Sequence, residues 1–93
     1  MLRLAILADT HGHVDDRVLA VVAECDIAIH GGDVGNAEIL RRLQPSTGRV
    51  LAVYGNNDTP RKWPLAEHDL LACLPPEASL DLPGGTLCLI HGH

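Results

Sequence analysis

The sequence predicts an α/β domain whose parallel sheet gathers polar side chains at one edge. Short apolar runs alternate with stretches of helical periodicity over the first half of the chain. Four of the apolar runs end in glycine-containing turns that carry Asp, Asn or His. Parallel strands finish at the same edge of a sheet, and ligands bind at that edge in open α/β folds. The turns are therefore expected to converge on one site.

A buried strand is predicted in the apolar run that begins the segment 27–35, which reads Ile-Ala-Ile-His-Gly-Gly-Asp-Val-Gly. Its β-branched and small apolar residues suit a strand that is covered on both faces. Gly31 and Gly32 allow a sharp turn and the close approach of another group. Asp33 is thereby placed at the carboxyl end of the strand. His30, inside the apolar run, is expected to be a hydrogen-bonded core residue rather than a ligand.

The remaining elements of the first half alternate in type. A buried strand is predicted over Leu2–Ala8, and a helix over Val14–Glu24, where valines recur at i, i+4, i+7 and i+8. A short helix over Ala37–Leu43 is followed by a third strand over Arg49–Val53. Strand–helix–strand units of this kind pack as parallel strands with right-handed crossovers.

The second half predicts a short helix over Leu65–Leu74 and then a hairpin. The runs Ala78–Leu82 and Thr86–Ile90 flank Pro83-Gly84-Gly85, which is typical of two antiparallel strands joined by a turn. The last run leads into His91-Gly92-His93. A strand that delivers His91 to a site is expected to continue into further sheet. We therefore interpret 1–93 as one domain that is incomplete at its C-terminus, with an open sheet edge through which copies of the chain could associate.

Composition limits the classes of partner. The formal net charge is −5, which argues against a general nucleic-acid or anionic-membrane surface, although bound metal ions could still admit a phosphate substrate. The N-terminal apolar run is too short for a signal peptide or a membrane span. The three cysteines lack metal-type spacing and are expected to be buried or half-buried thiols in a reducing compartment. These features predict a cytoplasmic protein.

The polar residues of the four turns predict a metal site. Asp9 and His11 are two residues apart and can point into one pocket, Asp33 offers two oxygens, Asn56 a carbonyl oxygen and His91 a second imidazole. Mixed carboxylate and imidazole ligands suit Mn²⁺, Fe²⁺, Zn²⁺ or Ni²⁺ better than Ca²⁺. Two such ions about 3.5–4 Å apart are a known arrangement for phosphoryl hydrolysis.

The ordered motifs Asp9-Thr-His11, Gly32-Asp33, Gly55-Asn56-Asn57-Asp58 and His91-Gly-His93 resemble the calcineurin-like metallophosphoesterase superfamily, in particular its small bacterial and archaeal phosphodiesterases. The resemblance implies the N-terminal part of a four-layer α/β/β/α sandwich, whose mixed sheet begins as parallel βαβαβ and includes a hairpin. It also implies two divalent ions, with Mn²⁺ the best fit and Ni²⁺, Fe²⁺ or Zn²⁺ as alternatives.

By the same resemblance, Asp9 and His11 would bind the first ion, Asp33 would bridge both, and Asn56 and His91 would bind the second. The implied catalytic positions are Asn57 and His93, which lines the site. Many relatives carry a general-acid His at the position of Asn57, and an amide cannot donate a proton in that way. A later Gly-His-x-His motif of the family is absent from the sequence.

These observations predict a dinuclear metal-dependent phosphoesterase that hydrolyses small phosphodiesters by a metal-bound hydroxide. The alternative is a non-catalytic protein-binding scaffold, or an inactive fragment, of the same fold. A mononucleotide-binding domain that uses Gly31 and Gly32 is disfavoured, because neither G-x-G-x-x-G nor a Walker-type Gly-Lys-Ser/Thr is present.

Overall fold

The computed structural model describes residues 2–91 of the 93-residue chain. Strands and helices alternate in its first half, and a hairpin follows in its second half. The elements are β1 (Leu4–Leu7), α1 (Asp16–Ala23), β2 (Ile27–His30), α2 (Ala37–Arg42), β3 (Arg49–Ala52), the 3₁₀ helix η1 (Leu65–Glu67), α3 (His68–Cys73), β4 (Glu77–Leu82) and β5 (Gly85–Ile90). This mixed α/β architecture confirms the predicted fold class.

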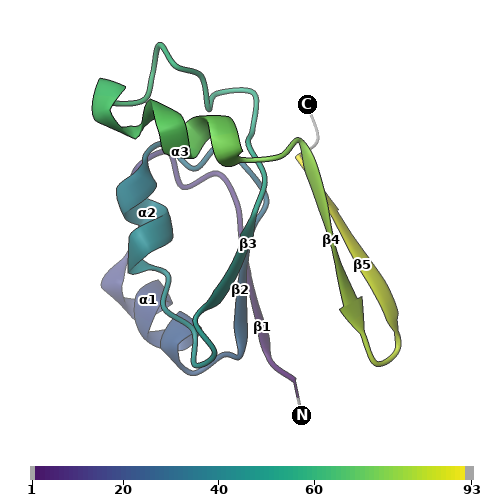
Figure 1. Cartoon of the computed structure of the whole chain (residues 1–93). Helices are drawn as coiled ribbons and strands as arrows, with labels where there is room; N and C mark the ends of the chain where they lie inside the picture. The colour runs from purple at the N-terminus through teal and green to yellow at the C-terminus, as the bar shows by residue number, and fades with distance from the viewer. Residues whose placement is uncertain (1, 92–93) are drawn as a thin grey trace.

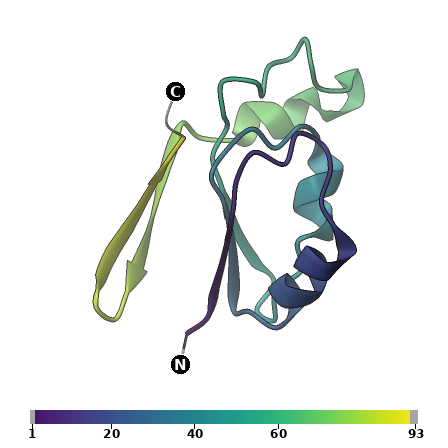
Figure 2. The same cartoon turned by 180° about the vertical axis from the view of Figure 1, so that it is seen from behind.

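Two separate sheets form the body of the described chain. The parallel sheet has the order β1–β2–β3, and β4 pairs with β5 in an antiparallel hairpin. Helices α1 and α2 cover one face of the parallel sheet and the hairpin lies over the other face, as both views show (Figures 1 and 2). The parallel strands all finish at the end of the sheet beside α3 (Figure 1). Polar turns that follow these strands are therefore neighbours.

The central strand β2 is buried along its whole length, as the sequence predicts. Ala28 faces the helices and packs in a cluster with Ala5, Val22, Cys25 and Leu43. Ile27 and Ile29 face the hairpin and form a cluster with Leu80. The alternation of side chains along a strand thus divides one apolar run between two cores.

Helix α2 begins where the sequence predicts, because Asn36 caps it. Its Oδ1 accepts a hydrogen bond from the backbone N–H of Ile39 at 3.2 Å. The predicted helix 65–74 is divided instead into η1 and α3, and no side chain caps either of them.

Two expectations about burial are wrong in part. Strand β1 was expected to be buried, but 65% of Ile6 is exposed, because β1 is an edge strand and the hairpin does not cover that side chain. Among the cysteines, Cys25 is buried, whereas Cys73 and Cys88 are exposed.

Candidate metal centre

Backbone hydrogen bonds hold the turn after β1 against the turn after β2. The N–H groups of Asp9 and His11 donate to the carbonyls of Gly32 and Asp33, each at 2.9 Å, and Gly12 N–H donates to Val34 O at 2.8 Å. The parallel pairing therefore continues past the ends of the strands. This continuation brings two segments more than 20 residues apart in sequence to the same edge.

Asp9, His11 and Asp33 form a compact group of metal-type ligands. One candidate ligand atom from each lies within 4.8 Å of the others. These same residues have backbone φ angles of 57°, 50° and 55°, and they are the non-glycine residues of the described chain with positive φ. Left-handed backbone costs free energy for residues other than glycine, and it clusters at functional sites. The chain therefore accepts local strain in order to aim these three side chains.

The Asp33 carboxylate lies at the centre of the group. Its Oδ2 is 3.8 Å from His11 Nε2 and 3.5 Å from His91 Nε2. Asn57 donates to both oxygens, from its backbone N–H at 2.8 Å and from Nδ2 at 3.0 Å. Burial raises the pKa of Asp33, but the hydrogen bonds of Asn57 and the two histidines outweigh it, so the pKa lies below its ordinary value. Asp33 is therefore an anion at neutral pH.

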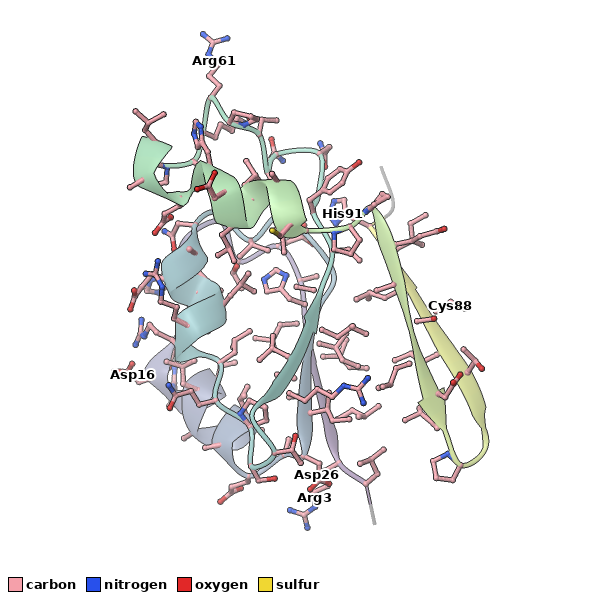
Figure 3. All side chains as sticks on the ribbon, in the orientation of Figure 1. Arg3, Asp16, Asp26, Arg61, Cys88 and His91 are labelled. Atoms are coloured by element: carbon pink, nitrogen blue, oxygen red, sulfur yellow. The ribbon has the colours of Figure 1, made fainter. Side chains whose placement is uncertain are left out.

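His91 reaches the centre from the other sheet, because it directly follows β5 (Figure 3). Its Nδ1–H donates to Gly31 O at 2.8 Å, which directs Nε2 toward Asn56 Oδ1 at 3.1 Å and Asp33 Oδ2 at 3.5 Å. Two oxygen atoms thus lie within 3.5 Å of this ring nitrogen. A backbone carbonyl that accepts from the far ring nitrogen is one of the common ways to orient a metal-binding histidine.

Two glycines leave room for these side chains. A Cβ on Gly55 would overlap the carboxylate and the backbone nitrogen of Asp33. A Cβ on Gly32, whose φ is +110°, would lie 2.6 Å from His91 Nδ1. The motif glycines are therefore required by close approach as well as by turn geometry.

A second layer of polar residues supports the turns. His30 is fully buried and accepts a hydrogen bond from Gly32 N–H at Nδ1, so Nε2 carries the proton and donates to Thr10 Oγ1 at 2.9 Å. The Thr10 hydroxyl donates in turn to Val34 O at 2.8 Å. Burial lowers the pKa of His30, which favours this neutral form. His30 is thus a core residue that ties two turns together, as expected from the sequence.

The structure brings most of the predicted site residues together and leaves two other histidines outside. Those that meet at the sheet edge are Asp9, His11, Asp33, Asn56, Asn57 and His91. His93 lies outside the described residues. His13 is exposed, and His68 Nε2 contacts Trp63 O at 3.1 Å rather than a residue of the centre.

Lys62 is a neighbour of the centre that the sequence did not reveal. Its Nζ donates to Asn57 Oδ1 at 2.6 Å, and it lines a cleft of about 240 Å³ with His11, Asn57 and Asp58. Lys62 lies in a loop between prolines with no periodic pattern. A lysine in such a loop gives no signal that separates it from a solvated surface residue.

Comparison with known proteins identifies the family. The model of the calcineurin-like phosphoesterase superfamily domain matches residues 2–93. The chain belongs to this superfamily. Among solved structures, a crystal structure of a single mutant of Vps29 from Entamoeba histolytica is similar, with a TM-score of 0.71 and 16% sequence identity. The similarity covers 99% of this chain and 49% of that chain, so the present chain spans about half the length of that relative.

A search of curated protein sequences found no significant match. In the part of the chain that the structure describes, no helix has the length and hydropathy needed to cross a membrane.

Proposed function

We propose that this calcineurin-like chain is a metal-dependent phosphoesterase that hydrolyses small phosphodiesters. The observation that carries the proposal is the group Asp9, His11 and Asp33, whose ligand atoms lie within 4.8 Å of one another on strained backbone. Membership of a phosphoesterase superfamily supports the same chemistry. We expect two divalent ions, with Mn²⁺ the best fit to mixed oxygen and imidazole ligands. When bound, two such ions would neutralise phosphoryl charge and lower the pKa of a bound water.

The side chains divide into two sets around Asp33. Asp9 and His11 would hold one ion, and Asn56 and His91 the other. Asp33 Oδ2 lies between the two imidazoles, 3.8 Å and 3.5 Å from their Nε2 atoms, which suits a bridging ligand. Gly31 O fixes the tautomer of His91, and Asn57 orients both oxygens of Asp33. The chain therefore supplies an oriented ligand set around the charged carboxylate of Asp33.

Asn57 is the residue of this set that faces the cleft without being a proposed ligand. Its amide can donate a hydrogen bond to a substrate oxygen, but it cannot supply a proton to a departing alkoxide. We therefore expect the protein to prefer substrates with good leaving groups.

A protein-binding scaffold is the second candidate function, and exposed apolar side chains favour it. Ile6 is 65% exposed on β1 and Ile90 is 68% exposed on β5. Apolar side chains that are exposed on sheet edges often mark contacts with other chains. The two functions can be separated by experiment. An enzyme needs the metal-binding residues for hydrolysis, whereas a scaffold has no hydrolysis to lose.

The deciding experiment replaces the central carboxylate. Asp33→Asn should lower the Mn²⁺ bound per chain and should reduce metal-dependent hydrolysis of bis(p-nitrophenyl) phosphate by at least about 100-fold, since loss of merely supporting residues costs about 10–100-fold. Asp16→Asn is the matched control, because it removes the same charge from an exposed side chain on α1, away from His91 (Figure 3).

Metal content would be measured by elemental analysis, and folding by circular dichroism. Absence of hydrolysis by the parent chain loaded with Mn²⁺ would contradict the enzyme proposal and would favour the scaffold. Equal metal content in Asp33→Asn and the parent would remove Asp33 as a ligand.

A further inference from the structure

Lys62 places a positive charge in the cleft beside the candidate metal centre. The described residues that line this cleft are His11, Gly35, Asn57, Asp58 and Lys62. Among them, Lys62 is the one that carries an ammonium group. In the described part of the chain, the Lys62 ammonium makes one hydrogen bond, to Asn57 Oδ1 at 2.6 Å, and no ion pair. Because a lysine ammonium has three N–H donors, two of them can be used by a ligand.

The partner of Lys62 connects it to the centre. Asn57 receives the lysine hydrogen bond at Oδ1 and donates from Nδ2 to Asp33 Oδ2 at 3.0 Å. The amide therefore separates the cation from the anion by two hydrogen bonds. A direct Lys–Asp ion pair would neutralise the carboxylate and compete with a metal ion, whereas this arrangement keeps both charges available.

Lys62 has an exposed side chain, but its backbone is held in place. Its N–H donates to Thr59 O at 3.0 Å, and the next residue, Trp63, is only 3% exposed. The Trp63 indole N–H donates to Asp58 Oδ1 at 3.0 Å. The preceding residue, Arg61, points away from the rest of the molecule (Figure 3). Of these two adjacent cations, Lys62 therefore lines the cleft and Arg61 does not.

We propose that Lys62 is a substrate-binding residue whose ammonium contacts a negatively charged phosphoryl oxygen in the cleft, beside Asn57. This inference rests on the proposed phosphoesterase function. Asp9, Asp33 and Asp58 make the surroundings of the cleft acidic. A cation there compensates for the repulsion between these carboxylates and an anionic substrate, and a charge-assisted hydrogen bond to a phosphoryl oxygen is among the stronger polar contacts.

The test measures binding of inorganic phosphate to the Mn²⁺-loaded chain by titration calorimetry, together with kcat and KM for bis(p-nitrophenyl) phosphate. Lys62→Gln should weaken phosphate binding and lower kcat/KM by about 10-fold or more, and Lys62→Arg should retain most of both. Arg61→Gln is the matched control, because it removes the same charge one residue away. Equal metal content in all variants would show that the centre is intact.

A double-mutant cycle separates contact with the substrate from support of Asn57. If Lys62 touches the phosphoryl group, Lys62→Gln still weakens phosphate binding in an Asn57→Ala background. If Lys62 acts only by orienting Asn57, the double variant binds phosphate as Asn57→Ala does, and the inference is wrong. Equal behaviour of Lys62→Gln and Arg61→Gln also overturns it. A parent chain that neither binds phosphate nor turns over with Mn²⁺ overturns the proposed function, and this inference with it.

Discussion

Asp58 holds the turn after β3 together by accepting four hydrogen bonds. The donors are the backbone N–H groups of Val34, Gly35 and Gly55, at 2.9–3.0 Å, and the indole N–H of Trp63 at 3.0 Å. Burial raises the pKa of Asp58, but these hydrogen bonds favour the charged form more strongly, so the pKa lies below its ordinary value. One carboxylate thus joins the turns that carry Asp33 and Asn57 to the loop that carries Lys62.

Asp58→Asn should destabilise the protein by about 2–4 kcal/mol, because an amide presents an N–H to donors and loses the charge-assisted bonds. The midpoint of thermal unfolding should fall by about 10 °C or more. Asp81→Asn, which changes an exposed carboxylate on β4, is the control. Circular dichroism melts at neutral pH would measure both variants.

The pH dependence of the stability of the parent and of Asp58→Asn gives a second readout. Since the folded pKa of Asp58 is depressed, its stabilisation is fully present above the unfolded pKa of about 3.9 and is lost as the pH falls through the folded pKa. The stability gap between the parent and Asp58→Asn should therefore narrow in acid. A gap that stays constant from neutral pH into this acidic range would show that the charge of Asp58 does not stabilise the fold.

For single residues, the sequence predicted which side chains belong to the site better than it predicted their backbone conformation. Asp33, Asn56 and His91 could be chosen because each follows an apolar run, and strand ends converge. The left-handed backbone of Asp9 and His11 could not be predicted, because it depends on the pairing of their turn with the turn after β2.

The hairpin β4–β5 is the element that carries His91 to the centre. Leu80 is only 3% exposed, and it packs with Ile27 and Ile29 of the central strand. The order of elements was predictable because apolar periodicity is local to each segment. The sequence did not predict which face of the parallel sheet the hairpin packs against, because a single apolar run supplies the residues on both faces of β2.

Leu80→Ala should destabilise the protein by about 2–5 kcal/mol through the cavity that it creates. It should also weaken Mn²⁺ binding, because looser packing of the hairpin frees His91 from its contact with Gly31 O. Cys88→Ala changes an exposed residue of β5 (Figure 3) and should leave both properties near those of the parent. Thermal melts and Mn²⁺ titration would measure the two effects. Unchanged Mn²⁺ affinity in a destabilised but folded Leu80→Ala would show that the hairpin does not position a ligand.

The two faces of the parallel sheet are covered unequally by the rest of the molecule. Helices α1 and α2 cover one face of the parallel sheet (Figures 1 and 2). On the other face, the hairpin buries Ile29 but leaves Ile6, its partner in the register of β1 and β2, 65% exposed. The sequence predicted an open edge on the hairpin; the exposed Ile6 on β1 was not predicted, because its exposure depends on where the hairpin lies.

We expect copies of the chain to associate through this part of β1, because an edge strand with exposed apolar side chains readily pairs with or packs on another chain. Ile6→Glu should reduce association, since burying the new carboxylate without a partner is costly. Leu65→Glu is the matched control: Leu65 is 82% exposed, but it lies on η1 and not on a strand. Sedimentation velocity at matched concentrations would show a slower species for Ile6→Glu than for the parent and Leu65→Glu. A monomeric parent, or equal sedimentation of all three chains, would show that exposed Ile6 is not a contact between copies.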